Sequence, residues 1–343
     1  MDYTSLFADK RILVLGGTGS IGSVIVKELL KYNPKQVRVY SRDESKHQEL
    51  LFSLSDLSKV RSLVGDIRDA ERLNFAMDGI DIVFNAAAMK HIPLCEFNPF
   101  EAIKTNVMGT QNVLDVALKH NVEKVITIST DKAAEPSNTL GATKLLAEKL
   151  TAAAHAYKGD RQTLFSAVRF GNVLGSSNSL LPIIRRQVLS GKPITITDKR
   201  MTRFIMPTEM AVQLVFQAVA HMKGGEIFVL KMPAVKIEEL IKAYVELLCE
   251  IHGIDSKITY LYTGKRAGEK MHEKLVSQHE EEVVREKGPL FVIPGTIYTT
   301  GAVSSDYKGS RAPRNASGYD SSMSKKLSRK EIKKMLQKFD LGT

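Results

Sequence analysis

A glycine-rich segment near the start of the chain has the residue types and the spacing of a dinucleotide-binding loop. An apolar run, Arg11–Leu15, leads into the sequence GGTGSIG, and a helical pattern follows directly. Glycines at this spacing allow a tight turn and a close approach of the backbone to a pyrophosphate, whose charge is stabilised at the helix N-terminus. The segment therefore predicts a dinucleotide cofactor, bound by Gly16, Thr18, Gly19, Ser20, Ile21 and Gly22.

Residues at the ends of the next predicted strands indicate which dinucleotide binds. Ser41 and Arg42 end the second strand, and Asp43 follows them. An acid at this point holds the ribose hydroxyl of NAD, whereas an arginine accommodates the extra phosphate of NADP. The order of these residues favours NADP. The cofactor is also expected to pass Asp66 and Ile67 after the third strand and Ala86, Ala87 and Ala88 after the fourth.

These motifs lie in an alternation of short strands and longer helices. Strands are predicted at 11–15, 36–40, 60–64, 80–84, 124–128 and 163–168, with helices near 20–32, 43–54, 69–77, 99–120 and 138–158. The nearly continuous apolar strands indicate burial on both faces, as in a parallel sheet. The alternation predicts an α/β fold with a doubly wound parallel sheet of the Rossmann type. Residues 1–171 are assigned to this NADP-binding domain.

The pattern changes beyond Gly171. Residues 172–294 are predicted to form mainly a smaller substrate-binding region that returns to the sheet twice, with helices near 179–190, 208–222 and 236–251 and strands at 194–197, 226–230 and 257–261. Residues 295–343 are predicted to be a basic loop followed by a helix. Ser328 and Glu331 form a capping box for that helix. Its apolar stripe (Ile332, Met335, Leu336 and Phe339) must pack on the body or on a neighbouring subunit.

Composition and charge narrow the class of protein. Two cysteines among 343 residues cannot build a disulfide framework, and no apolar run approaches the roughly 18 residues that span a bilayer. The chain is therefore expected to be cytoplasmic, with no membrane segment. Residues 301–343 carry ten Lys and Arg against four acids, which indicates a solvated tail and no nucleic-acid partner. Scattered histidines and the absence of HExxH or CxxC predict no metal site.

The end of the fifth strand completes a set of motifs. Its sequence STDKAAEPSNTLGATK runs from Ser129 to Lys144. In chain order with GGTGSIG, SRDE, NAAAMKHIPLCE, KTNVMGT, VRFGNVLGS, ITDKRMTRF and RAGEK, it resembles the extended short-chain dehydrogenase/reductases. Within that group the chain is most similar to the soluble UDP-N-acetylglucosamine 4,6-dehydratases of polysaccharide biosynthesis. The matching segments run across nearly the whole chain.

The resemblance implies an NADP-dependent lyase that turns UDP-N-acetylglucosamine into a 4-keto-6-deoxy sugar with inversion at C-5. Oxidation at C-4 acidifies the C-5 proton. By resemblance, Lys132 removes that proton and Asp131 protonates the departing C-6 hydroxyl, so both need perturbed pKa values. Thr130 would hydrogen-bond near C-4, and Lys144 would bind the nicotinamide ribose. Since family members are oligomers, a homo-oligomer (a hexamer or a dimer) is expected.

The resemblance also implies further ligand contacts. Asn106 is expected to order the backbone of the active site. The residues expected to bind the cofactor also include Lys90, Asn106, Ser129 and Lys144. The residues expected to bind the substrate are Lys90, His91, Arg169, Asn172, Arg203, Arg266 and Glu269. Arginines suit a diphosphate because the planar guanidinium binds its oxygens in pairs.

One position departs from the general family pattern. The usual Tyr-x-x-x-Lys pair reads Leu140 to Lys144 here, and none of the ten tyrosines has a lysine four residues later. An alcohol dehydrogenase or a 4-epimerase needs that tyrosine as a base, which disfavours both. In the resembling dehydratases the position is tyrosine in some members and methionine in others. Two alternatives stay open: a C-5-retaining dehydratase of the bacillosamine type, and a non-catalytic protein that senses NADP.

Overall fold

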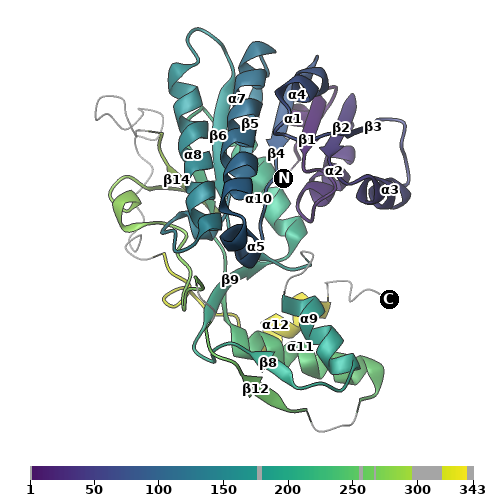
Figure 1. Ribbon diagram of the computed structural model, residues 1–343, viewed down its shortest axis with the longest axis vertical. Helices are drawn as coiled ribbons and strands as arrows, with labels where there is room; N and C mark the ends of the chain where they lie inside the picture. Colours follow the sequence, from purple (N-terminus) through teal and green to yellow (C-terminus); the bar gives the residue numbers. More distant parts are fainter. Residues whose placement is uncertain (1, 176–179, 255–257, 266–267, 296–318, 338–343) are drawn as a thin grey trace.

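The chain builds one large sheet and a smaller lobe beside it (Figure 1). The computed structural model describes residues 2–175, 180–254, 258–265, 268–295 and 319–337. The large sheet has nine strands in the order β13-β14-β10-β6-β5-β4-β1-β2-β3. Its strands are β1 (Arg11–Leu15), β2 (Gln36–Ser41), β3 (Val60–Val64), β4 (Ile82–Asn85), β5 (Lys124–Ile128), β6 (Leu164–Arg169), β10 (Ile227–Leu230), β13 (Arg285–Lys287) and β14 (Leu290–Ile293).

Strand pairing confirms the predicted doubly wound architecture. The strands from β3 across to β10 are parallel, and β14 and β13 continue the sheet antiparallel. The chain starts at β1, winds outward to β3, and then returns to β4 on the other side of β1. The strand order therefore reverses between β1 and β4, which is where open sheets of this kind bind ligands at their carboxyl ends.

Helices cover both faces of the sheet, and side chains of one strand alternate between two cores. Ile12 and Val14 of β1 join a cluster with α1 (Thr4–Phe7), α2 (Gly22–Leu30), α3 (Glu44–Phe52) and α10 (Thr208–His221). Leu13 and Leu15 join the opposite cluster, with α4 (Ala70–Met77), α7 (Gly109–Lys119) and α8 (Thr139–Tyr157). This alternation is what a sheet buried on both faces requires.

Two sequence-based expectations in this domain were wrong. Strand β3 is exposed at Arg61, Ser62 and Val64, because it is the last strand of the sheet and lacks a neighbour on one side. The helix predicted at 99–120 is divided into α6 (Pro99–Ile103), a π-helical turn (Lys104–Met108) and α7, and a short α5 (Ile92–Phe97) precedes it. Such π-helical turns are often found at functional sites.

The smaller lobe is assembled from separate parts of the sequence. It contains α9 (Leu180–Leu189), α11 (Ile237–His252) and the pair β8 (Ile194–Ile196) and β12 (Tyr260–Tyr262). A three-stranded sheet of β7 (Asn172–Val173), β9 (Thr202–Met206) and β11 (Ala234–Lys236) lies between this lobe and the body (Figure 1). Residues 172–294 return to the large sheet through β10 and again through β13 and β14.

The C-terminal helix α12 (Arg329–Gln337) packs on α11 of the same chain. Ile332, Met335 and Leu336 are buried in the core of the smaller lobe. Lys333 forms ion pairs with Glu246 at 3.0 Å and Glu250 at 3.1 Å, so acids of α11 offset part of the tail's charge. The predicted capping box forms, and Phe339 lies outside the described residues. In the described part of the chain no helix is long and apolar enough to cross a membrane.

Candidate active site

The glycine loop lies against the end of β4, at the point where the strand order reverses. Gly16 has φ +69°, and a Cβ on it would lie 2.7 Å from the backbone nitrogen of Ala87. A Cβ on Gly22 would collide with the carbonyl oxygen of Gly16. The backbone packing thus accepts only glycine at these two positions, and it brings the predicted glycine and alanine segments together.

The end of β2 carries a chain of hydrogen bonds that the sequence did not reveal. The Thr18 and Ser41 hydroxyls lie 2.7 Å apart. His47 of α3 is buried, with Nε2 3.0 Å from Ser41 Oγ and Nδ1 2.5 Å from Ser62 Oγ. The position of His47 one turn before Leu50, on the buried face of the 43–54 helix, was the available signal.

The charged residues after β2 and β3 face solvent. Arg42 is more than half exposed, 3.7 Å from Asp66, and Asp66 also pairs with Arg68 at 2.7 Å. Burial alone would raise the pKa of Asp66, but the hydrogen bonds and charge of Arg68 lower it below its usual value. Asp43 does not reach toward a ribose, because its carboxylate caps α3. Ile67, expected beside an adenine, has its side chain in the core.

The catalytic segment is a tight turn directly after β5. Asp131 is fully buried, and its Oδ1 accepts hydrogen bonds from the Thr130 hydroxyl at 2.9 Å and from Lys132 Nζ at 2.8 Å. A Cβ on Gly141 of α8 would collide with the carbonyl oxygen of Lys132, so the helix start packs directly on the turn. The turn and α8 therefore hold the carboxylate and the amine together at the carboxyl edge of the sheet.

A carboxylate that sequence reasoning missed, Glu273, lies on the other side of Lys132. It is buried, with Oε1 3.7 Å from Lys132 Nζ and 3.8 Å from Arg203 Nε. Arg203 also lies 3.8 Å from Glu269, so two predicted substrate residues do come together. Glu273 follows the RAGEK motif by only three residues, which was the available signal. Arg266 of that motif lies outside the described residues.

Two carboxylates set the charge environment of Lys132. Burial lowers the pKa of Lys132, but attraction to Asp131 and Glu273 outweighs burial, and the net shift is upward. These two carboxylates favour the ammonium form of Lys132, so the amine must lose a proton before it can act as the expected base. The pKa of Glu273 is raised, chiefly by burial.

Lys144 and Asn106 form hydrogen bonds to the backbone near the Asp131–Lys132 turn. Lys144 is buried and donates to the carbonyl oxygen of Ile128 at 2.5 Å, and burial lowers its pKa to about 8. Asn106 accepts from the Met89 amide at 2.8 Å and donates to the Met89 carbonyl and to Thr143. Both amide hydrogens of Asn106 are thus committed to the protein, in keeping with its expected role in ordering the backbone. These bonds leave none of its donors for a cofactor.

The loop after β4 brings its predicted residues toward the glycine loop. Lys90 Nζ lies 3.3 Å from the Ser20 hydroxyl, so this lysine already touches the expected cofactor loop. His91 follows, and burial together with the charge of Lys90 lowers its pKa. Asn172 is exposed in β7. Leu140 is buried beside Cys95 and offers no proton-transfer group.

Arg169 does not serve the role expected from sequence. Its guanidinium is fully buried, with bidentate bonds to Glu148 of α8 and to Glu280 and a further bond to the Leu275 carbonyl. These five contacts use every N–H of the side chain. Arg169 therefore has no donor left for a diphosphate, and instead ties α8 to the segment that carries Glu273.

Unpaired buried polar atoms mark the same edge of the sheet. In the part of the chain that the structure describes, six buried side-chain atoms lack a hydrogen-bond partner. Four of them belong to Asn85 at the end of β4, Ser129 and Asp131 after β5, and Glu273. Because buried polar groups are normally paired, this concentration indicates a site completed by a ligand. Within the described ranges no cluster of three or more His, Cys, Asp or Glu could hold a metal ion.

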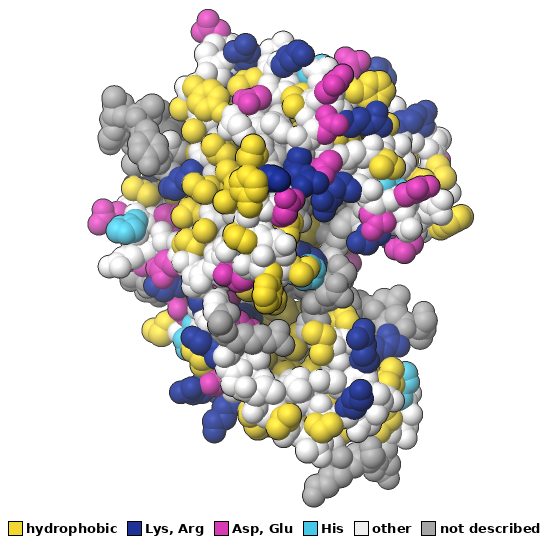
Figure 2. Space-filling view, in the orientation of Figure 1, with side chains coloured by type: hydrophobic (Ala, Val, Ile, Leu, Met, Phe, Trp, Pro, Cys, Tyr) yellow, Lys and Arg dark blue, Asp and Glu magenta, His cyan; other side chains and the backbone are white. Residues whose placement is uncertain are grey.

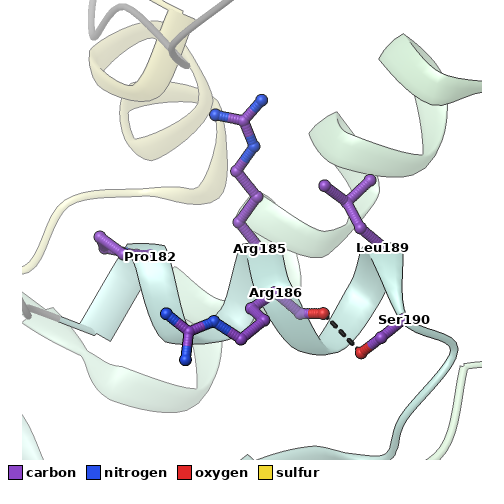
Figure 3. Close-up of a pocket in the computed structure, with 5 residues that line it drawn as sticks. All are labelled: Pro182, Arg185, Arg186, Leu189 and Ser190. Carbon is purple, nitrogen blue, oxygen red and sulfur yellow. Dashed lines mark hydrogen bonds between the residues drawn. The ribbon is translucent and has the colours of Figure 1, made fainter.

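Surface hollows elsewhere in the molecule do not coincide with this edge. One lies on α9 and is lined by Pro182, Arg185, Arg186, Leu189 and Ser190, all from a single stretch of the smaller lobe (Figure 3). Another is lined by Asn121, Asp160, Arg161 and Gln162. Neither contains a residue predicted to bind cofactor or substrate.

Comparison with known proteins finds relatives that match almost the whole chain. The family described as "Polysaccharide biosynthesis protein" matches residues 12–294. An uncharacterized membrane protein of Methanocaldococcus jannaschii is 49% identical over 98% of both chains. An inverting UDP-N-acetylglucosamine 4,6-dehydratase of Campylobacter jejuni is 42% identical over 85% of both chains. A UDP-glucose 4-epimerase of Rickettsia typhi is 39% identical over 98% of this chain and 97% of its own.

A solved structure extends this similarity to the whole fold. The X-ray structure of Pen from Bacillus thuringiensis has a TM-score of 0.89 and 39% sequence identity to this chain. The match covers 98% of this chain and 99% of that chain. The nine-stranded sheet and the smaller lobe are therefore a shared architecture.

Proposed function

Because the chain belongs to the polysaccharide biosynthesis protein family and has the extended short-chain dehydrogenase/reductase fold, we propose that it is a UDP-N-acetylglucosamine 4,6-dehydratase. One observation carries the proposal: the buried Asp131 is paired with the partly exposed Lys132 at the carboxyl edge of the sheet, where a buried leucine replaces the usual tyrosine. The inverting dehydratase of Campylobacter jejuni, 42% identical, supports the choice of reaction and sugar.

The cofactor proposed for the site is NADP. The fit rests on the glycine loop packed against Ala87 and on the unpaired buried Asn85 and Ser129 side-chain atoms beside it. A nicotinamide bound there would take a hydride from C-4 and return it to C-6. Arg42 supports the choice of NADP, because its guanidinium is exposed and its 3.7 Å contact with Asp66 can be exchanged for a contact with a phosphate.

In the turn after β5, one residue acts as the acid and its neighbour acts as the base. Asp131 protonates the departing C-6 hydroxyl, and Lys132 removes the C-5 proton once it has become neutral. Thr130, which donates to Asp131 at 2.9 Å, hydrogen-bonds near C-4. Lys144 orients the nicotinamide ribose from behind the turn. Arg203 and Glu269, which lie 3.8 Å apart, face the uridine diphosphate together with Lys90, His91, Asn172 and Arg266.

UDP-glucose 4-epimerase is the second candidate, favoured by the name of the Rickettsia typhi relative at 39% identity. The buried Leu140 disfavours it, because an epimerase needs a base at this position. Two further alternatives remain. A C-5-retaining dehydratase would replace inversion by retention, and a non-catalytic protein that senses NADP would bind the cofactor without turnover. Incubation with UDP-N-acetylglucosamine and, separately, with UDP-glucose tests the choice. We expect a 4-keto product from the first and no C-4 epimer from the second.

We also infer that the enzyme works in the cytoplasm as a homo-oligomer, a dimer or a hexamer. Large apolar side chains are exposed on and next to α5, α6 and α8, and hydrophobic side chains gather on the face of the molecule that these helices occupy (Figure 2). Apolar gatherings of this kind are typical of protein interfaces. The exposed set includes Leu94, Phe97, Phe100, Met108 and Leu146. Light scattering after size-exclusion chromatography is expected to give twice or six times the 38.0 kDa chain mass.

A further inference from the structure

The proposed mechanism leaves Lys132 with a proton that it must lose. A lysine that takes the C-5 proton has to be neutral, yet here the ammonium lies 2.8 Å from Asp131 and 3.7 Å from Glu273. The amine therefore needs a nearby group that can accept its proton before each turnover. The inference that follows rests on the proposed dehydratase function.

Glu273 has the placement of such an acceptor. Its side chain is 4% exposed, and in the described part of the chain no hydrogen bond reaches Oε2. Its contacts with Lys132 and Arg203, at 3.7 and 3.8 Å, are longer than hydrogen bonds. A buried carboxylate stabilised by few hydrogen bonds takes up a proton more readily than one that accepts several.

Asp131 is the less suitable acceptor on the same grounds. Its Oδ1 already accepts hydrogen bonds from the Thr130 hydroxyl and from Lys132 Nζ, whereas no contact of Glu273 with these residues is as short as a hydrogen bond. The mechanism also needs the Asp131 proton for the leaving hydroxyl. The two carboxylates beside Lys132 thus have separate environments and can serve separate tasks.

We propose that Glu273 accepts the proton of Lys132 and so makes Lys132 the base of the reaction. The ammonium of Lys132 loses one proton to the carboxylate of Glu273, which gives a neutral amine and a carboxylic acid with no change in net charge. The amine then takes the C-5 proton, and the C–H electron pair forms the C-5–C-6 double bond while the C-6–O bond breaks and the hydroxyl leaves as water with the proton of Asp131. The proton that the C-4 hydroxyl releases on oxidation restores Asp131. After Lys132 has reprotonated C-5 on its opposite face, which requires the sugar ring to flip, Glu273 returns its proton to Lys132 and the starting state is restored.

The charges around Glu273 are compatible with this exchange. Burial raises the pKa of Glu273 and Asp131 adds to the rise, whereas Lys132, Arg203 and Lys270 lower it. Burial works in the opposite direction on Lys132, whose pKa it lowers. Expulsion of water by a bound substrate strengthens both burial effects, because each disfavours a charged form. Substrate binding therefore favours the neutral pair over the ion pair.

The fold holds Glu273 in place through its backbone. The Glu273 amide donates to the Ser321 hydroxyl at 2.9 Å, and the Ser321 amide donates back to the Glu273 carbonyl at 2.9 Å. Ser321 is fully buried and its hydroxyl lies 2.7 Å from that of Thr202 in β9. A segment almost fifty residues farther along the chain thus holds the backbone of Glu273 and keeps its carboxylate beside Lys132.

The pH profile of kcat tests the proposal. An internal acceptor predicts that wild-type kcat for UDP-N-acetylglucosamine is flat between about pH 7 and 8.5, because the proton moves within the pair. In Glu273→Gln, Lys132 must lose its proton to solvent, so kcat falls at least about tenfold at pH 7 and then rises by up to about tenfold per pH unit. Glu273→Asp, which keeps the carboxyl, should retain the flat profile, and Glu286→Gln on exposed β13 controls for loss of charge.

Three outcomes would overturn the proposal. A loss of kcat in Glu273→Gln that is the same at every pH would make the role structural. Unchanged or higher kcat at pH 7 would make Glu273 a brake that only holds Lys132 charged. A wild-type kcat that itself rises tenfold per pH unit through neutrality would show that no internal acceptor exists, and this result does not depend on how any variant folds.

A labelling experiment separates this proposal from the proposed function. Acetic anhydride acetylates only neutral amines, so mass spectrometry of the Lys132 peptide against pH reports its protonation without substrate. Loss of the Glu273 charge should move half-maximal labelling to lower pH in Glu273→Gln but not in Glu286→Gln. Unchanged labelling would overturn the coupling. If the labelling shifts but the wild type does not convert UDP-N-acetylglucosamine, the proposed function fails and only the charge contact between Glu273 and Lys132 stands.

Discussion

Replacement of Arg169 by methionine should destabilise the protein more than almost any other single change. The guanidinium lies 2.6 Å from Glu148 and 2.8 Å from Glu280, and its side chain has no exposed surface. Methionine is unbranched and uncharged and fills part of the same space, so the buried Glu148 and the nearly buried Glu280 would both lose their partner. Removal of one member of a buried ion pair costs about 3–5 kcal/mol, because the remaining charge stays desolvated.

The size of this effect can be measured as a melting temperature. At about 2 °C per kcal/mol, the low end of the range for mid-sized domains and suited to a longer chain, Arg169→Met should lower Tm by about 6–10 °C. The triple variant that also carries Glu148→Gln and Glu280→Gln should recover much of the loss, since it leaves no buried charge unpaired. Differential scanning calorimetry of the three proteins provides the comparison.

The loss should also depend on pH in a defined direction. Burial alone would raise the pKa of Glu280, but Arg169 and the Ser277 hydrogen bonds lower it below the usual value. A depressed folded-state pKa contributes stability above the unfolded value of about 4.3, and this contribution disappears as the pH falls through the folded value. The Tm difference should therefore be full at pH 7 and shrink below about pH 4. A Tm change under about 2 °C, together with a raised KM for the nucleotide sugar, would refute the structural role of Arg169.

Three further outcomes are expected. Arg42→Ala should shift the ratio of dissociation constants toward NAD, as measured by fluorescence titration; equal wild-type affinity for NAD and NADP would refute the choice of cofactor. Asp131→Asn and Lys132→Met should fold and bind substrate but lose roughly 10²–10⁴-fold in kcat, and activity within a few-fold of wild type in both would exclude the pair as acid and base. Deletion of residues 322–343 exposes the apolar face of α11 and should lower Tm with the oligomer intact; salt-sensitive DNA binding lost on the same deletion would instead assign the tail to nucleic acid.

The elements that sequence reasoning placed well are those set by local patterns. The bounds of β1, β3 and β5 agree with prediction, and for β1 and β5 the reason is that short apolar runs between turn residues define buried strands. The exposure of β3 could not be predicted, since it depends on which strand ends the sheet. The division of the 99–120 helix was also missed, because a π-helical turn differs from an α-helix only in its backbone hydrogen bonds and has no residue signature of its own.

Local motifs likewise located the glycine loop and the Asp131–Lys132 turn, whose members are close in sequence. The residues that were missed or misassigned act through distant partners. Arg169 meets Glu280 across 111 positions, and Glu273 meets Lys132 across more than a hundred. A lone arginine or glutamate in a sequence carries no sign of a buried partner so far away. Its role becomes visible only when the fold brings the two together.

The product formed from UDP-N-acetylglucosamine in D₂O tests the central claim most directly. Dehydration predicts a 4-keto-6-deoxy sugar with deuterium at C-5, and inversion predicts proton NMR couplings of the L-arabino configuration in the earliest spectra. A D-xylo product from the first time point would replace inversion by retention. Unchanged substrate, or a C-4 epimer without deuterium at C-5, would contradict the assignment as a 4,6-dehydratase.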